Sequence, residues 1–142
     1  MINNDDLIAY LPHSLREEVV YQSSKSLLTS MFKEYKSENL IRKLAVVLES
    51  AIYLPGDFIL YKGDIGEEMY FIAEGSVRSL SDDKQTINKT LHKGSFFGET
   101  AIIFPTKRQN SIQAETFCII RVLKGEDFRY VAQDFPDIHK QL

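Results

Sequence analysis

One segment of the chain, residues 94–115, combines side chains that suit a small phosphorylated sugar. It reads GSFFGETAIIFPTKRQNSIQAE, so a strand runs into Gly98 and one short helical turn is predicted to begin there. Unpaired N–H groups at a helix start form an anion site, because they point outward and the helix dipole favours negative charge. Arg108, on the returning loop, can add a forked cation, and the Glu99 carboxylate can accept hydrogen bonds from sugar hydroxyls. The segment therefore predicts a site for a phosphate and a sugar.

Glu99 and Arg108 also have simpler interpretations when each is taken alone. A glutamate in a first helical turn is favourable because of the helix dipole, and a single loop arginine is most often solvated. Together with Gly98, at this spacing and between two strand-like runs, they favour a binding site.

Residue types that carry catalysis do not gather in any comparable pattern. His13, His92 and His139 lie far apart and lack metal-ligand spacing, and there is no H-x-H pair followed by glutamate. No Ser/His/Asp or Cys/His arrangement is evident either. Cys118 stands inside an apolar run and is predicted to be a buried core thiol. We therefore expect a protein that is not an enzyme and that holds neither a metal nor a cofactor.

The composition is that of one soluble globular domain. The chain has 142 residues, 44% hydrophobic and 26% charged, and its net charge of −3 gives no indication of nucleic-acid binding. A single cysteine excludes an intrachain disulfide and favours a reducing compartment. No apolar run approaches the roughly 20 residues that span a bilayer, and the N-terminus lacks a secretory signal. We expect an intracellular location without direct membrane insertion.

Helical periodicity appears on both sides of a β-rich middle. Ser14 and Glu17 have the spacing of a capping box, so a helix is predicted to begin there. Ser37 is the expected N-cap of a second helix from about residue 38 to 49. After Gly125, apolar residues return at helical intervals and predict a further helix.

The middle of the chain consists of short β-branched and aromatic runs separated by turn residues, most of them glycines. Several short strands at such spacing predict a small antiparallel barrel or jelly roll. The predicted strands are Ala51–Leu54, Phe58–Lys62, Met69–Ala73, Ser76–Ser81, Gln85–Leu91, Gln109–Glu115 and Cys118–Leu123.

The pattern FGETA-x(6)-RQNSI at residues 97–112 resembles the phosphate-binding cassette of cyclic-nucleotide-binding domains, FGE(I/L)A…R(T/A)A(S/T)V. Three further stretches resemble the same family: YLPGD at 53–57, KGD with MYFI between 62 and 72, and EGSV at 74–77. The resemblance covers about residues 38–142. It implies an α+β fold, an antiparallel β-roll or jelly-roll barrel of about eight strands, with helices at both ends and a short phosphate-cassette helix.

Upstream, LPHSLREEV at residues 11–19 resembles the C-linker segment of cyclic-nucleotide-gated, hyperpolarisation-activated and related potassium channels. QAETFC at 113–118 is also similar to the channel version. The resemblance implies that residues 1–36 are the helical end of a C-linker and residues 37–142 a cyclic-nucleotide-binding domain. The long lid helix that closes the site in this family would be represented by Pro136–Leu142 alone, so we expect weak nucleotide binding.

The resemblance also implies roles for the cassette residues. Glu99 would hold the ribose 2′-hydroxyl, and Gly98 would let the backbone approach the ligand. Amides near Thr100 and Ala101 would face the cyclic phosphate, and Arg108 would neutralise it.

Four residues around the cassette bear on selectivity. Val77 and Leu91 are weaker candidates for the apolar wall beside the base. Gln109 and Asn110 replace the small residues that usually follow the arginine, so they would crowd the phosphate or supply new donors to it. The usual rule, in which threonine at the first of these positions favours cGMP, does not apply to glutamine.

The implied function is a cytoplasmic regulatory module that binds cAMP or cGMP and couples binding to gating of a ligand-gated cation channel. Its implied partners are the pore domain of the same channel and neighbouring subunits of a tetramer. The alternative is an interaction module of the same fold that does not bind nucleotide, as in ether-à-go-go-type channels. Arg108 argues against that alternative, whereas Gln109 and Asn110 argue mildly for it. A cyclic-nucleotide-regulated kinase subunit would need a second cassette or an inhibitor sequence, and neither is visible.

Overall fold

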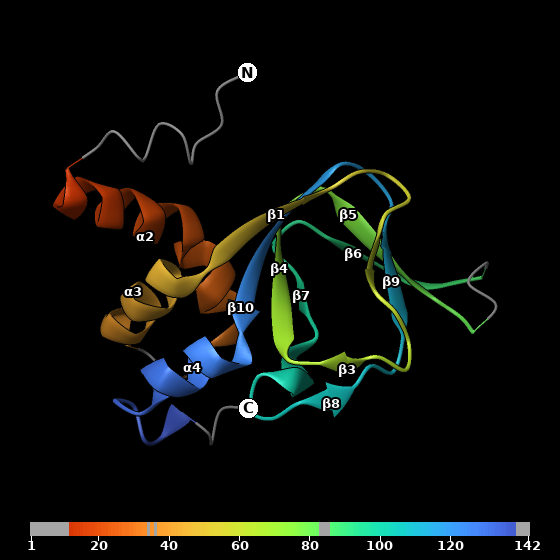
Figure 1. Cartoon of the computed structure of the whole chain (residues 1–142). Helices are drawn as coiled ribbons and strands as arrows, with labels where there is room; N and C mark the ends of the chain where they lie inside the picture. The colour runs from red at the N-terminus through yellow and green to blue at the C-terminus, as the bar shows by residue number, and fades with distance from the viewer. Residues whose placement is uncertain (1–11, 34, 36, 83–85, 139–142) are drawn as a thin grey trace.

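Helices gather on one side of the molecule and strands on the other (Figure 1). This is a computed structural model, and it describes residues 12–33, 35, 37–82 and 86–138. Three helices, α2 (His13–Met31), α3 (Glu38–Val47) and α4 (Gly125–Ala132), pack beside a β-roll of ten short antiparallel strands. The predicted fold class is therefore confirmed. No helix in the described part of the chain is long and apolar enough to cross a bilayer.

Helix α2 begins at His13, one residue before the predicted position, and the predicted capping box is wrong. Pro12 is the N-cap, with no side-chain hydrogen bond, and its backbone oxygen accepts from the Arg16 N–H at 2.9 Å. Ser14 therefore lies inside the first turn, where its hydroxyl does not cap the helix. Glu17 instead pairs with His13, one turn away, with 3.0 Å between Oε1 and Nε2.

Helix α3 is capped as the sequence predicts. The Ser37 hydroxyl accepts a hydrogen bond from the Leu40 N–H at 3.2 Å, which satisfies one of the free donors at the helix start. The helix ends at Val47, two residues earlier than predicted. Leu48 is already extended, with ψ 138°, and the first strand begins at Glu49.

The strands form two four-stranded sheets and one small pair. The first sheet has the order β1-β10-β4-β7, the second β2-β9-β5-β6, and β3 pairs with β8. All seven predicted strands are present within about two residues. Two of the two-residue strands, β3 and β8, were not predicted, whereas the third, β7, is the strand expected to run into Gly98. The bounds are β1 Glu49–Tyr53, β2 Phe58–Leu60, β3 Ile65–Gly66, β4 Glu68–Glu74, β5 Ser76–Leu80, β6 Ile87–His92, β7 Phe96–Phe97, β8 Thr106–Lys107, β9 Ser111–Ala114 and β10 Cys118–Lys124.

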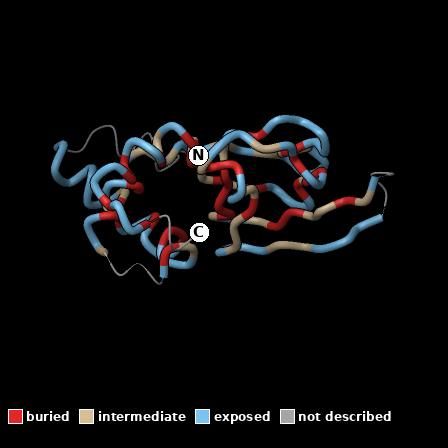
Figure 2. The backbone as a smooth tube through the Cα atoms, turned by 90° about the horizontal axis from the view of Figure 1, so that it is seen from below, coloured by how far each residue is buried: buried red, intermediate tan, exposed pale blue. Residues whose placement is uncertain are grey.

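The core has two parts, which Figure 2 shows as buried segments between the helices and sheet and within the roll. One cluster joins the helices to β4 and β10 through side chains such as Leu44, Phe71 and Phe128. The other fills the roll and includes Ile72, Val77 and Cys118. The predicted buried thiol is confirmed, because Cys118 is fully buried and its Sγ donates to the Ser76 carbonyl at 3.2 Å.

Candidate functional site

The predicted helical turn after Gly98 is present as a single 3-10 turn, η1 (Glu99–Ala101). Gly98 has φ 77°, in the left-handed region that favours glycine. A Cβ at this position would stand 2.9 Å from Arg108 Nη1 and 3.2 Å from the Glu68 carbonyl oxygen. Gly98 is therefore required both by its backbone conformation and by the lack of space around it. The turn is closed by the Ala101 N–H, which donates to the Gly98 carbonyl at 3.2 Å.

A hollow of about 320 Å³ lies between this cassette and the sheet β2-β9-β5-β6. Six of the predicted site residues line it: Leu91, Gly98, Glu99, Thr100, Gln109 and Asn110. The other described lining residues are Leu60, Ser79, Lys89, Phe96, Phe97 and Ile112. The hollow thus combines apolar and polar side chains, and it brings the cassette together with strands from both halves of the roll.

Three predicted site residues, Val77, Ala101 and Arg108, are buried and do not line the hollow. Val77 is fully buried in the roll, opposite Leu91 and Ala114. Ser79 takes the place beside the hollow that was expected of Val77, because side chains two residues apart on a strand face the same side.

The floor of the hollow is one row of residues that crosses four strands. Leu60 pairs with Ile112, Ile112 with Ser79, and Ser79 with Lys89. The sequence reasoning missed Leu60, Ile112, Ser79 and Lys89. The available signal was the period of two, which places Lys89 on the same face as the predicted Leu91.

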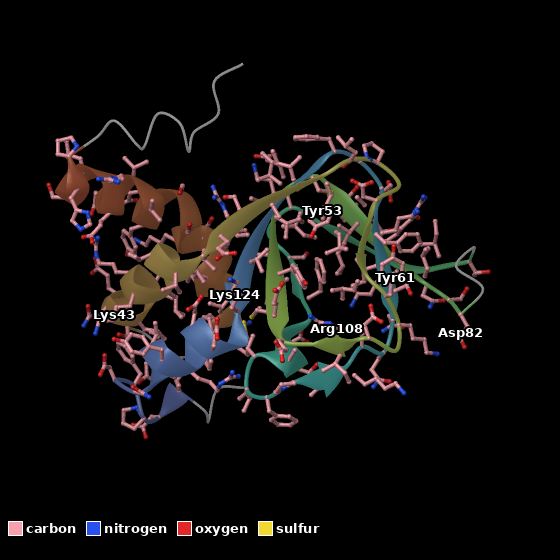
Figure 3. The ribbon with its side chains drawn as sticks, in the orientation of Figure 1. Lys43, Tyr53, Tyr61, Asp82, Arg108 and Lys124 are labelled. Carbon is pink, nitrogen blue, oxygen red and sulfur yellow. The ribbon has the colours of Figure 1, made fainter. Side chains whose placement is uncertain are left out.

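Arg108 is 8% exposed and its guanidinium contacts two backbone carbonyls. Nη2 donates to the Glu68 oxygen at 2.7 Å, and Nη1 donates to the Gly98 oxygen at 3.4 Å. The guanidinium therefore lies behind the cassette, near the ends of β3 and β4, where Figure 3 labels it. Gly66 leaves the necessary space, because a Cβ there would stand 2.6 Å from Nη2 and still closer to Nε and Cζ.

Tyr70 forms a further side of the space around Arg108. Its ring lies 5.7 Å from the guanidinium carbon and stacks on Phe97 with 5.1 Å between ring centroids. The Tyr70 hydroxyl donates to Glu68 Oε2 at 3.0 Å. Burial and the adjacent Glu68 carboxylate raise the pKa of Tyr70 well above its usual value, whereas the Arg108 charge acts in the opposite direction.

The polar groups at the rim are accessible to a ligand. Glu99, Thr100, Gln109 and Asn110 are all exposed, and the Gln109 side-chain amide donates to the Lys107 carbonyl at 3.4 Å. Carboxylate, hydroxyl and amide groups beside the apolar side chains of Leu60, Leu91 and Ile112 suit a ligand with a sugar and a flat ring. In the described residues, no three His, Cys, Asp or Glu side chains gather closely enough to hold a metal ion.

Comparison with known proteins gives one family match, to the cyclic nucleotide-binding domain, over residues 51–135. The chain is 31% identical over 137 residues to the human potassium/sodium hyperpolarization-activated cyclic nucleotide-gated channel 2. It is 32% identical over 144 residues to the mouse cyclic nucleotide-gated channel alpha-4. Both alignments cover 96% of this chain, but 15% of the first relative and 25% of the second. The chain therefore spans a quarter or less of the length of these relatives.

Proposed function

Because the chain belongs to the cyclic nucleotide-binding domain family, we propose that it binds cAMP or cGMP in the hollow beside the cassette and acts without catalysis. The observation that carries this proposal is the composition of the hollow. Its cassette rim holds Glu99 beside Gly98, and the apolar side chains of Leu60 and Ile112 lie in the row of residues below. A volume of about 320 Å³ is at the lower end of the range for small-molecule sites.

Each cassette residue then has a distinct task. Glu99 accepts from the ribose 2′-hydroxyl, since a carboxylate only accepts hydrogen bonds when ionised. Arg108 neutralises the phosphate from behind the turn. A guanidinium has five N–H donors, so the two carbonyl contacts of Arg108 leave others for a phosphate. Gln109 and Asn110 supply amide donors where smaller residues are usual in the family.

Contacts behind the cassette support a coupling between the hollow and the helices. Arg129 of α4 donates through Nη1 to the carbonyls of Ile102 and Ile103, at 3.2 and 3.3 Å. Ile102 is fully buried in the cluster that contains the helix residues Leu44 and Phe128. A ligand that moves the cassette would therefore move α4 and the N-terminal helices. Such coupling requires the ligand to bind one arrangement better than the other.

The names of the two relatives, both of them channels, support a coupling to a channel. We propose that residues 1–36 form the helical end of a C-linker and residues 37–142 the binding domain, although residues 1–11 and 139–142 lie outside the described part of the chain. The module would be cytoplasmic and would transmit ligand binding to the pore domain of a cation channel. Neighbouring subunits of a tetramer would be its further partners.

A second candidate is an interaction module of the same fold that does not bind nucleotide. The placement of Arg108 favours it, because the guanidinium already has two carbonyl partners and does not line the hollow. The bulkier Gln109 and Asn110 on the rim favour it as well.

Isothermal titration calorimetry of the chain with cAMP and cGMP tests the proposal. Glu99→Gln keeps the size of an exposed side chain but removes its charge, so the fold is expected to remain intact. Loss of a hydrogen bond to a charged group is expected to weaken binding about 10- to 100-fold. Glu115→Gln, a matched change of an exposed glutamate outside the hollow, should leave binding unchanged.

Two outcomes would contradict the proposal in different ways. No heat with either nucleotide at millimolar concentration would refute nucleotide binding and favour the interaction module. Equal binding by wild type, Glu99→Gln and Arg108→Ala would refute the assigned residues but not the function. Because Arg108→Ala also removes two carbonyl contacts, its thermal unfolding should be measured alongside its affinity.

A further inference from the structure

The floor of the hollow contains a cation that the cassette motif does not predict. Lys89, on β6, ends the row that begins at Leu60 and passes through Ile112 and Ser79. It lines the hollow and is exposed to solvent. Within the described part of the chain, its side chain forms no ion pair or hydrogen bond. Its ammonium group is therefore available to a ligand in the hollow.

Lys89 differs from the other polar groups of the hollow in what it offers a base. The hydroxyls of Ser79 and Thr100 and the amides of Gln109 and Asn110 can all both donate and accept hydrogen bonds. An ammonium group has three donors and no acceptor. Among the described lining residues, Lys89 is thus the one whose side chain can only donate.

The two purines present different atoms to such a donor. Guanine carries two adjacent acceptors, O6 and N7, and lysine contacts to this pair are among the common ways in which proteins recognise guanine. Adenine has the acceptor N7 beside the N6 amino group, which is itself a donor. An ammonium group beside that edge is attracted by the two acceptors of guanine. Beside adenine it lies next to the N6 amino group, which is also a donor and repels it.

The position of Lys89 places this donor beside the surface that suits a flat ring. Lys89 and Leu91 are two residues apart on β6 and so share one face, and both line the hollow with Leu60 and Ile112. Glu99 and Gly98 belong to the cassette turn, which suits the sugar and the phosphate. A nucleotide held by the cassette would therefore direct its base towards the sheet that carries Lys89.

We propose that Lys89 is a specificity-determining residue that makes the hollow prefer cGMP over cAMP, by donating to the O6 and N7 edge of guanine. This inference rests on the proposed function, because it requires a cyclic nucleotide in the hollow. The contact is exposed to solvent, so its contribution lies at the lower end for charged pairs.

The test is calorimetric titration of wild type, Lys89→Met, Lys89→Arg and Lys93→Met with cGMP and with cAMP. Lys89→Met keeps an unbranched stem and removes the ammonium. Its cGMP affinity is expected to fall about fivefold, with the cAMP affinity unchanged or improved. Lys89→Arg keeps a cation that can only donate, so it should keep the preference for cGMP.

Lys93→Met is the control, because it removes the same charge from a neighbouring lysine that pairs with Glu74 and does not line the hollow. It should leave the ratio of affinities unchanged.

The outcomes separate this inference from the proposal on which it rests. A wild type that binds both nucleotides, with a cGMP to cAMP ratio that Lys89→Met does not change, overturns the role of Lys89 and leaves the proposed function intact. The same holds if Lys89→Met and Lys93→Met change the ratio equally, because the effect is then one of net charge. A wild type that binds neither nucleotide overturns both. A fall in the ratio in Lys89→Met alone, together with its recovery in Lys89→Arg, supports the inference.

Discussion

Replacing Gly66 by alanine tests the position of the Arg108 guanidinium directly. Gly66 lies on β3, opposite Thr106 of β8. A Cβ at Gly66 would stand 2.6 Å from Arg108 Nη2 and closer still to Nε and Cζ. Since these atoms belong to a flexible side chain, the guanidinium is expected to move rather than the strand. The methyl group would thereby separate Arg108 from the carbonyls of Glu68 and Gly98.

The magnitude follows from the two hydrogen bonds that would be lost. The bond to Glu68 is short, at 2.7 Å, and the bond to Gly98 is long, at 3.4 Å, so the first carries most of the effect. A hydrogen bond to a charged group contributes about 1.5 to 3 kcal/mol. Alanine offsets about 0.4 to 1 kcal/mol of that by restricting the unfolded chain. We therefore expect the free energy of unfolding to fall by about 1 to 2 kcal/mol.

The assay is urea unfolding followed by circular dichroism, because the chain has no tryptophan to report by fluorescence. Gly66→Ala is measured in wild type and in Arg108→Ala, as a double-mutant cycle. In the Arg108→Ala background there is no guanidinium to displace, so the substitution should be neutral or slightly stabilising. An equal loss of stability in both backgrounds would refute the placement of Arg108 behind the cassette.

Two further predictions address Val77 and Tyr70. Val77→Ala should lower the free energy of unfolding by roughly 1 to 3 kcal/mol through loss of buried methyl groups, without changing nucleotide affinity. A change in nucleotide affinity with an unchanged free energy of unfolding would contradict this and indicate that Val77 contacts the ligand. The raised pKa of Tyr70 keeps its hydroxyl protonated in the folded chain while an unfolded tyrosine ionises near pH 10. Stability is therefore lost as pH rises above about 10, and Tyr70→Phe should make this loss less steep in urea unfolding. Parallel profiles for the two proteins would contradict the shift.

Much of the fold could be predicted because its signals are local. Ser37 caps α3 through a hydroxyl three residues from its donor, and Gly98 begins a turn whose left-handed backbone conformation favours glycine. The seven longer strands were found because short β-branched and aromatic runs, separated by turn residues, are visible in the sequence. Strands β3 and β8 have two residues each, too few for any period, so nothing in the sequence marks them. Strand β7 is equally short and was expected only as the strand that runs into Gly98.

The site was less predictable because its remaining contacts depend on register and distance. Val77 and Ser79 lie on the same face of β5, and the pairing of β5 with β6 and β9 decides which of the two side chains reaches the hollow. Arg108 was singled out by its motif, but its observed partners are backbone carbonyls, and backbone atoms leave no pattern in a sequence. The Glu68 carbonyl is 40 residues away.

The two carbonyl contacts of Arg108 decide which substitution can test nucleotide binding cleanly. A phosphate that approaches the guanidinium competes first with the Gly98 carbonyl, because the 3.4 Å contact is weaker than the 2.7 Å contact with Glu68. Exchange of that one contact would change the cassette while β4 stays attached to Arg108. Arg108→Ala removes both contacts whether or not a ligand is present, so loss of affinity in that variant mixes ligand contact with stability. Glu99 is exposed, so the affinity of Glu99→Gln is the more direct measure of whether this hollow binds a nucleotide.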